Sequence, residues 1–297
     1  MRFSAEEADW DWVFSEEADW DMEKTDLRSV KAETAGLKNT VNGEDEELLK
    51  MWKAEESIAY IHGWDFSHLN GRCEEEPLPW DYKAEILCRL KPSMRILDMD
   101  TGGGEFLMSL RHPFEKLAAT EGYPPNVKLC EETLLPLGID FRPAESGGKI
   151  PFEDESFDMV LNRHGSFCPE EIYRVLKPGG SFVTQQVGAE NDREFVELLL
   201  GEDVKIPFPN QYLELTKKAF NEAGFTVTDG KEHRGQMRFS DTGALVWFAR
   251  VLPWEFPDFS AAQCTDRLFR AEELLQEQGF LSGTIHRYFL VAEKRGK

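Results

Sequence analysis

The chain has 297 residues, of which 41% are hydrophobic and 12% are aromatic. This is enough apolar material for a packed core, and it excludes a chain that is disordered throughout. Lys and Arg number 34 against 56 Asp and Glu, which gives a net charge of -22. Such a charge repels duplex nucleic acid and anionic membranes, so we expect neutral or cationic small molecules as partners.

Two further features narrow the class of protein. The longest apolar stretch, near residues 243–254, is interrupted by Arg250 and is too short to cross a bilayer. The acidic N-terminus lacks a basic segment followed by an apolar one, so we expect no secretory signal and a cytoplasmic protein. The five cysteines form no C-x-x-C pair, and we therefore expect neither a metal site nor a disulfide framework.

Acidic side chains are concentrated at the N-terminus. Residues 1–60 carry 17 acidic and 7 basic side chains, and the sequence FSAEEADWD at 3–11 nearly repeats as FSEEADWD at 14–21. This composition predicts an acidic, flexible tail over residues 1–45, followed by a folded domain over 46–297. An alternative is a linear motif in the tail that presents Trp10 and Trp20 to a protein partner.

The hydrophobic pattern predicts a helix over residues 45–61, then an irregular aromatic segment, then a helix capped by Asp81 that ends near Leu90. A regular alternation follows. Strands are expected at 94–100, 116–121, 139–142, 157–162 and 181–187, with helices at 105–110, 126–135 and 169–176 between them and a KPGG turn at 177–180. The last third predicts helices at 211–222 and 266–278, an apolar amphipathic segment at 242–251, and strands at 225–229 and 284–292.

Alternating strands and helices predict an α/β fold. We expect a Rossmann-like, doubly wound, mostly parallel seven-stranded sheet with helices on both faces and its ligand at the carboxyl ends of the strands. The last two strands should form a hairpin-like edge with the intervening helices above it. Aromatic segments near residues 60–82 and 240–270 are expected to act as lid elements over the ligand.

The segment ILDMDTGGGEFL at 96–107 places a glycine loop between a buried strand and a helix, a pattern shared by several nucleotide-binding folds. A dinucleotide would bring its pyrophosphate against Asp98 and Asp100, at about 4 kcal/mol for each charge pair ~4 Å apart at an effective dielectric near 20. The third glycine of the dinucleotide pattern is also replaced, by Leu107. S-adenosylmethionine carries a sulfonium and an ammonium instead, which these carboxylates would attract, and Glu121 at the next strand end could bind ribose hydroxyls.

Four segments taken in order, ILDMDTGGGEFL, LAATEG, IPFEDESFDMVLNRH and EIYRVLKPGGSFV, resemble the class I S-adenosylmethionine-dependent methyltransferases of the type 11, small-molecule kind. The resemblance covers residues 80–187 and extends more loosely to the C-terminal strands. It implies a methyltransferase that acts on a small-molecule acceptor. The cofactor set that it implies consists of Asp98, Gly102 and Gly104 for the methionine part, Glu121 for the ribose, Ala144 and Glu145 for the adenine, and Asn162 beside the methyl group. We expect Asp100, whose carboxylate would attract the sulfonium, and Gly122, which follows Glu121, to bind the cofactor as well.

The sequence departs from this family pattern at two positions. Glycine is usual where Asp100 stands, and many members have an aspartate where this chain has Pro143. These departures keep open a second hypothesis, a degenerate methyltransferase that serves as an interaction module. A nicotinamide-dependent oxidoreductase is a third, which the carboxylates of the glycine loop disfavour.

Methyl transfer from a sulfonium mainly requires alignment of the reacting groups, and it requires a base only if the acceptor must lose a proton. His164, in NRHGSF, is the candidate base, and its alternative role is packing beside the site. Asn162 is the second catalytic candidate, as a group that positions the acceptor.

Overall fold

The computed structural model describes residues 43–61 and 65–296. The chain divides into a unit of Met1–Glu46 and a unit of Glu47–Lys297, and the second carries the fold. The predicted acidic tail and its near repeat lie almost wholly outside the described residues, so tail flexibility and a tail-bound partner stay predictions. No helix in the described ranges is long and apolar enough to cross a membrane.

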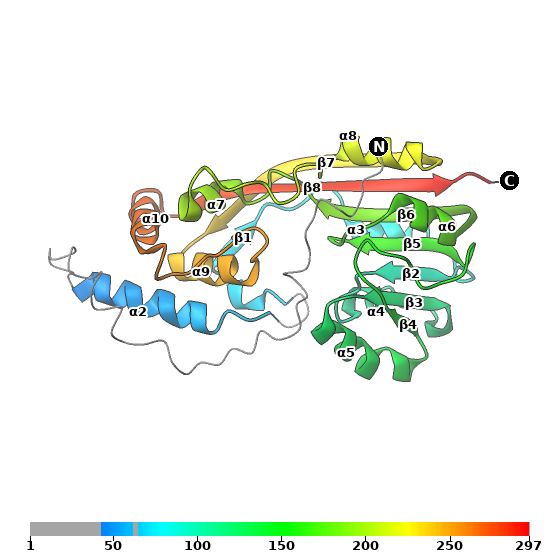
Figure 1. Ribbon diagram of the computed structural model, residues 1–297, viewed down its shortest axis with the longest axis horizontal. Helices are drawn as coiled ribbons and strands as arrows, with labels where there is room; N and C mark the ends of the chain where they lie inside the picture. The colour runs from blue at the N-terminus through cyan, green and yellow to red at the C-terminus, as the bar shows by residue number, and fades with distance from the viewer. Residues whose placement is uncertain (1–42, 62–64, 297) are drawn as a thin grey trace. The chain divides into compact units, whose positions relative to one another are not determined.

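The second unit is built on one eight-stranded sheet, with strands in the order β1-β7-β8-β6-β5-β2-β3-β4 (Figure 1). The strands are β1 Cys73–Glu75, β2 Ile96–Met99, β3 Leu117–Glu121, β4 Asp140–Pro143, β5 Phe157–Arg163, β6 Leu176–Val187, β7 Phe225–Phe239 and β8 Leu281–Lys294. The α-helices are α2 Gly43–Ser57, α3 Tyr82–Leu87, α4 Glu105–Ser109, α5 Pro124–Thr133, α6 Pro169–Val175, α7 Arg193–Leu200, α8 Leu213–Glu222, α9 Thr242–Val251 and α10 Thr265–Gln278. Short 3₁₀ turns lie at Ser67–Leu69, Phe114–Lys116 and Leu135–Leu137.

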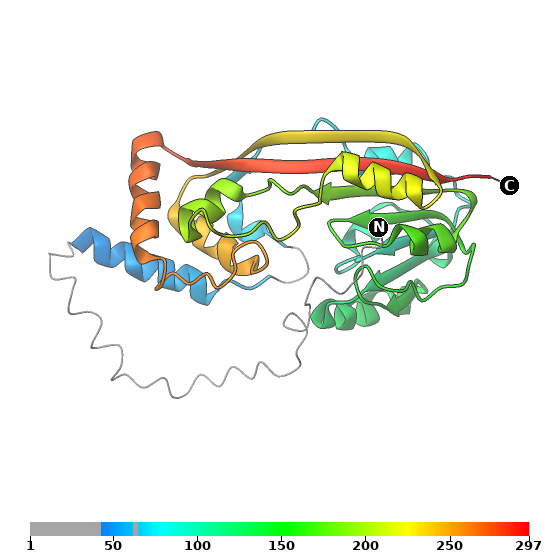
Figure 2. The same cartoon turned by 45° about the horizontal axis from the view of Figure 1, so that its top comes forward.

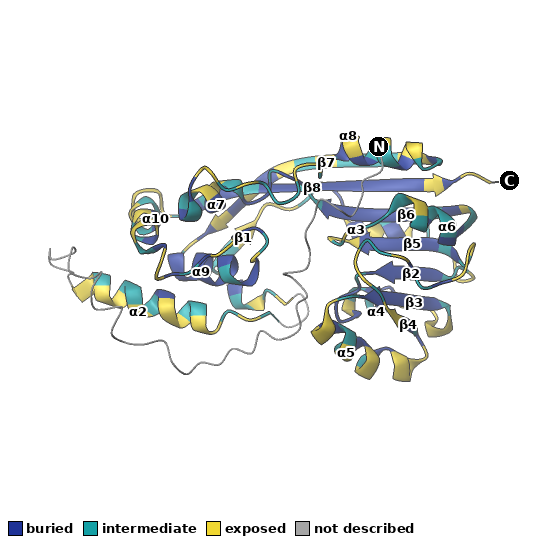
Figure 3. Ribbon diagram, in the orientation of Figure 1, coloured by how far each residue is buried: buried dark blue, intermediate teal, exposed yellow. Residues whose placement is uncertain are grey.

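Five of the strands, β6, β5, β2, β3 and β4, are parallel, whereas β8, β7 and β1 pair antiparallel. Helices α3, α4 and α5 cover one face of the sheet and α6 and α8 cover the other, each over its own apolar cluster, and the strands between them are buried (Figure 3). The Rossmann-like prediction is confirmed. The predicted strand number is corrected from seven to eight, because the three-residue, Glu-rich β1 carries too little pattern to be recognised.

The parallel part of the sheet starts at β2; the chain adds β3 and β4 on one side and returns to add β5 and β6 on the other. The point between β2 and β5 is therefore the topological switch point, where ligands of doubly wound sheets bind beyond the carboxyl ends of the strands. We call the carboxyl ends of β2 to β6, with the loops that follow them, the carboxyl edge.

Strands β7 and β8 form a long antiparallel ribbon, paired from Phe225 with Lys294 to Phe239 with Leu281 (Figure 2). The sequence predicts a strand only to residue 229, because GKEHRGQMR is polar and lacks an apolar repeat. The far end of the ribbon supports a second apolar cluster with α2, α7, α9 and α10. Trp52 is fully buried in it, and its indole N–H donates to Thr242 Oγ1 at 2.8 Å.

This second cluster contains most of the aromatic side chains that were expected in lid elements. Trp247 and Phe256 are buried in it, and Phe66 packs against Trp247 with ring centroids 6.1 Å apart. Trp64 lies outside the described residues. The aromatic rings therefore form a core around the ribbon, and closure over the carboxyl edge remains a prediction.

The KPGG segment differs from its prediction as a separate turn. Strand β6 begins at Leu176, and its register with β5 shifts between the pairs Phe157–Leu176 and Met159–Ser181. The four residues Lys177–Gly180 are thus an irregularity within the strand, where Gly179 has φ of 79° and Lys177 Nζ donates to Asp158 at 2.7 Å.

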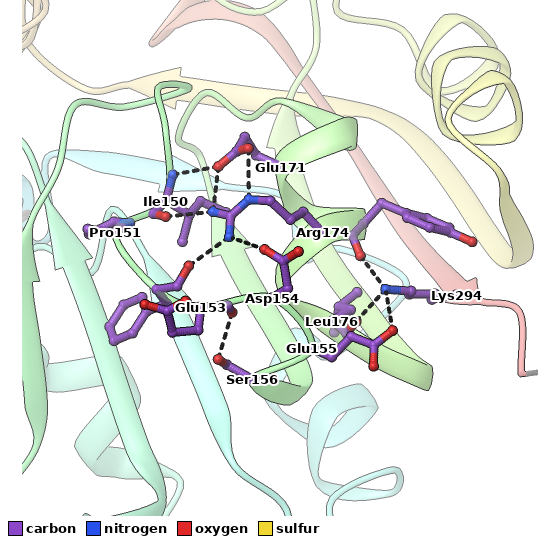
Figure 4. A network of polar contacts seen from close by, with 12 residues as sticks. Ile150, Pro151, Glu153, Asp154, Glu155, Ser156, Glu171, Arg174, Leu176 and Lys294 are labelled. Carbon is purple, nitrogen blue, oxygen red and sulfur yellow. Dashed lines mark hydrogen bonds and ion pairs between the residues drawn. The ribbon is translucent and has the colours of Figure 1, made fainter.

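The connection between β4 and β5 is held by a guanidinium (Figure 4). Arg174 in α6 donates to the carbonyl oxygens of Ile150 and Phe152, both at 2.7 Å, and forms two hydrogen bonds with Glu171 at 2.7 and 3.0 Å. Asp154 accepts a further bond at 3.0 Å. One side chain therefore anchors the loop that leads into the central strand β5.

Candidate active site

The loop after β2 turns sharply at the carboxyl edge. Asp100, Gly102 and Gly104 have φ of 53°, 65° and 83°, the left-handed region that glycine tolerates best and aspartate better than most residues. A Cβ on Gly104 would lie 2.6 Å from Leu134 Cδ2. Close packing of α4 on α5 therefore requires glycine there.

Glu121 ends β3 and holds this loop. Its side chain is 5% exposed and accepts hydrogen bonds from the backbone N–H groups of Gly102 at 2.8 Å, and of Gly122 and Tyr123 at 2.9 Å. Burial raises the pKa of Glu121, and these N–H donors oppose the rise. One N–H of the glycine loop is thus already bonded to the carboxylate for which ribose binding is predicted.

Asp98, the third residue of β2, is 3% exposed and accepts a hydrogen bond from Thr101 Oγ1 at 2.7 Å. Burial raises its pKa to about 6, although the Thr101 hydroxyl and the positive charge of Arg163 act in the opposite direction. The neighbouring charge of Glu121 adds to the rise. Asp98 therefore lies in the negative surroundings that the sequence predicts.

Asp100 follows on the same strand end and is half-buried. Its Oδ2 accepts hydrogen bonds from Ser146 Oγ at 2.8 Å and from Asn162 Nδ2 at 3.3 Å. Burial raises its pKa to about 7, and the charges of Glu121 and Asp98 contribute. The three carboxyl groups thus lie within electrostatic range of one another at the switch point.

The predicted ribose and adenine positions come together in the loop after β4. A Cβ on Gly122 would lie 2.8 Å from the Ala144 carbonyl oxygen, and Ala144 N–H donates to the Glu121 carbonyl at 3.0 Å. Glu145 is exposed, and Pro143 ends the edge strand β4. Gly122 is therefore required for the close approach of these two loops.

Asn162 in β5 is fully buried. Its Nδ2 donates to the Met99 carbonyl at 3.4 Å and to Asp100, and its Oδ1 accepts from Gln186 Nε2 at 2.5 Å. Both ends of the amide are thus bonded within the protein. Asn162 links β2, β5 and β6, which suits a positioning group.

His164 has φ of 65° and follows directly on the central strand β5. The Trp80 indole N–H can only donate, and it donates to Gln185 Oε1 at 2.8 Å, so the amide nitrogen of Gln185 faces His164 Nε2 at 3.3 Å. That nitrogen also only donates, so His164 Nε2 accepts and its proton lies on Nδ1. Although the residue reaches solvent, desolvation by the surrounding protein lowers its pKa well below the usual value, and the charges of Arg287 and Arg163 add to the effect.

The pattern QQVG at the end of β6 contains site residues that sequence reasoning missed. Gln185 orients His164, and Gln186 holds Asn162. Two adjacent amides at the end of an apolar strand are the signal that could have indicated them. Within the described ranges, no group of three or more His, Cys, Asp or Glu side chains is arranged to hold a metal ion.

Two more carboxyl groups are buried near the ribbon. Asp192, which precedes α7, is 1% exposed, and Glu255 is 8% exposed. Burial raises the pKa of Asp192 to about 8 and that of Glu255 to about 7, although the guanidinium of Arg287 opposes both shifts. Asp192 Oδ1 has no hydrogen-bond partner, which adds to the cost of its ionised form.

These two groups should make stability fall with rising pH. Carboxyl groups whose pKa is raised on folding bind more protons in the folded than in the unfolded chain, so these groups make the free energy of unfolding decrease from about pH 4 to about pH 8. We expect Asp192→Asn to be more stable than wild type at pH 8 by on the order of 2–4 kcal/mol, with the difference vanishing near pH 4, close to the pKa of an aspartate in the unfolded chain. Urea unfolding at the two pH values measures this, and a constant difference at both would contradict it.

Comparisons with known proteins agree with this architecture. A family model described as a methyltransferase domain matches residues 97–184. The phthiotriol/phenolphthiotriol dimycocerosates methyltransferase of Mycobacterium tuberculosis is 36% identical over 101 residues, 31% of this chain and 36% of that protein. The demethylmenaquinone methyltransferase of Thermus thermophilus is 32% identical over 116 residues, 36% of this chain and 53% of that protein.

These matches span about a third to a half of the length of the curated relatives. A crystal structure of a candidate methyltransferase from Bacillus halodurans C-125 shares the fold, with a TM-score of 0.51 and 20% identity over 72% of this chain and 98% of that one. The matched segment runs from β2 into β6 and contains the carboxyl edge just described. Residues 97–184 thus match a methyltransferase domain, and the chain shares the fold of the Bacillus halodurans protein.

Proposed function

We propose that this protein uses S-adenosylmethionine to methylate a small-molecule acceptor. One observation carries the proposal: Asp98, Asp100 and Glu121 gather around a glycine loop at the switch point of a doubly wound sheet. Burial raises the pKa values of all three carboxyl groups, repulsion from Glu121 adds to the rise at Asp98 and Asp100, and the positive charge of Arg163 opposes it at Asp98. A sulfonium and an ammonium would offset the negative charge of these carboxyl groups, whereas a pyrophosphate would be repelled.

The residues present fit this donor. Gly122 lets the loops after β3 and β4 approach closely at Ala144, and Glu121 Oε2, beside the Gly102 N–H, can accept a further hydrogen bond. We propose that Glu121 and Gly122 bind the ribose, that Ala144 and Glu145 line the adenine, and that Asp98, Asp100, Gly102 and Gly104 hold the methionine part. The bound donor would supply an activated methyl group.

The chain's own residues would act mainly by alignment. Asn162 fixes the relative positions of the ends of β2, β5 and β6 through both ends of its amide, which favours a role in positioning. His164 is neutral near pH 7, with Nε2 bonded to Gln185. It would have to release that bond before accepting a proton from an acceptor, so the present geometry favours His164 as a hydrogen-bond donor through Nδ1.

The acceptor class rests on the relatives. Those reported above are named for small organic acceptors, a phthiotriol lipid and a demethylmenaquinone. The net charge of -22 also disfavours nucleic acid as an acceptor. We therefore propose an uncharged or cationic organic acceptor.

Calorimetric titration of the full chain tests this function. S-adenosylmethionine and S-adenosylhomocysteine should each bind at one site. Asp98→Ala should lower the affinity for S-adenosylmethionine by about tenfold or more, because it removes a buried charge partner. NAD⁺ should neither give heat nor raise the melting temperature. A folded chain that binds neither adenosyl ligand, or that binds NAD⁺ instead, would exclude the proposal. Binding without transfer to 1,4-naphthoquinol or to other small acceptors would favour the degenerate, interaction-module alternative.

A further inference from the structure

Asp100 stands at the position where the resembled family usually has glycine, and it faces the switch point between β2 and β5. Its carboxylate reaches across two neighbouring loops: Ser146 Oγ, after β4, and Asn162 Nδ2, at the end of β5, donate to the same oxygen. Ser146 Oγ in turn accepts from Ser166 N–H at 3.1 Å. One acidic side chain therefore joins the three strand ends between which an adenosyl ligand would lie.

The surrounding backbone accommodates this carboxylate specifically. A Cβ on Gly165 would lie 2.2 Å from Asp100 Oδ2 and 2.7 Å from its Cγ. Gly147 has φ of 72°, and a Cβ there would lie 3.2 Å from Ser166 Cβ. Gly165 thus leaves room for the side chain of Asp100, and Gly147 leaves room for Ser166, whose N–H donates to the Ser146 hydroxyl that binds Asp100.

The charges around Asp100 are mostly negative. Asp98 and Glu121 face it from β2 and β3 and raise its pKa, while Ser146 and Asn162 supply only neutral donors. Arg163, which acts on Asp98, points its guanidinium over the Phe106 ring at 4.8 Å. An incoming fixed positive charge would therefore relieve the repulsion among the three carboxyl groups.

We propose that Asp100 sets the charge specificity of the cofactor site, favouring the sulfonium donor over its neutral thioether product. This inference rests on the proposed function. In transfer, the acceptor's lone pair forms the new bond to the methyl carbon while the carbon–sulfur bond breaks and its electron pair stays on sulfur. Sulfur thereby loses its positive charge, and the acceptor's proton passes to solvent or to a base. The attraction to Asp100 disappears at that moment, which promotes release of the product.

The test compares the affinities of S-adenosylmethionine and S-adenosylhomocysteine by calorimetry, for the wild type and for Asp100→Asn, between about pH 5.5 and 7.5. Asparagine tolerates the same positive φ and keeps an oxygen for Ser146, so this variant removes charge alone. In the wild type, the preference for the sulfonium ligand should rise with pH as the carboxyl group ionises. In Asp100→Asn the preference should fall about tenfold near pH 7.5 and little near pH 5.5.

Matched variants separate charge from structure. Ser146→Ala removes the hydroxyl that donates to Asp100 but keeps the carboxylate, so the preference for S-adenosylmethionine should persist. Glu115→Gln removes an exposed, remote carboxylate and should change neither affinity. If Asp100→Asn is unstable, Asp100→Gly replaces it, because glycine adopts φ of 53° without strain. The inference would be overturned if Asp100→Asn bound both ligands equally less tightly, or if the ratio of the two affinities did not change. A wild type that binds neither ligand would overturn the proposed function instead.

Discussion

Replacing Glu121 with glutamine is expected to weaken binding of S-adenosylmethionine by about 100-fold. The carboxylate accepts three backbone N–H groups, from Gly102, Gly122 and Tyr123. An amide offers one acceptor oxygen and turns its own N–H₂ group toward at least one of those donors. Losing one charge-assisted hydrogen bond and leaving a buried N–H group unpaired costs about 2–3 kcal/mol. The proposed hydrogen bond to the ribose is lost as well.

Calorimetric titration measures this effect, and thermal unfolding reports the accompanying loss of stability. Glu131→Gln serves as the control, because Glu131 is an exposed carboxylate of α5 and should leave both quantities unchanged. If Glu121→Gln bound S-adenosylmethionine within about threefold of the wild type, Glu121 would be a structural residue alone and the proposed ribose site would be wrong.

Replacing Arg174 with methionine should lower the free energy of unfolding by about 2–4 kcal/mol. The guanidinium satisfies two backbone carbonyls and both oxygens of Glu171, and its side chain is only 24% exposed (Figure 4). Methionine fills similar space but leaves these acceptors unpaired. Arg174→Lys should recover only part of the lost stability, because a lysine ammonium cannot make the several in-plane hydrogen bonds of the guanidinium.

Urea unfolding measures the change in stability. Arg270→Met is the matched control: Arg270 pairs with Glu273 at 2.9 Å, but the two side chains are 55% and 62% exposed, and such pairs contribute less than about 1 kcal/mol. Equal effects of the two substitutions would show that the network around residues 150–156 does not stabilise the path into β5.

Much of the carboxyl edge could be predicted from the sequence because its features depend on residues that are close together in the chain. Apolar strands ending in Asp98, Glu121 and Asn162 follow one another at helix-plus-strand spacing, and parallel strands bring their carboxyl ends to one edge. The predicted helix cap at Asp81 is likewise confirmed, since its carboxylate accepts a hydrogen bond from the Ala84 N–H at 3.0 Å.

Features that depend on distant partners could not be predicted. Strand β7 is polar beyond residue 229, and its pairing with β8 across a helical insertion decides its length. The aromatic residues 247 and 256 look like lid residues in sequence, but they are buried against α2, α7 and α10, which no local pattern indicates. The bonds of Asp100 to Ser146 and Asn162 join residues 46 and 62 positions apart, so only the folded chain reveals them.

The central claim is that the acidic carboxyl edge binds a positively charged nucleoside. A crystal structure of the full chain grown with S-adenosylmethionine tests it most directly. The account predicts the ribose hydroxyls against Glu121, the adenine beside Ala144, and the sulfonium on the side of Asp98 and Asp100. An adenosyl group bound elsewhere, or a ligand phosphate seated against Gly102 and Gly104, would contradict it.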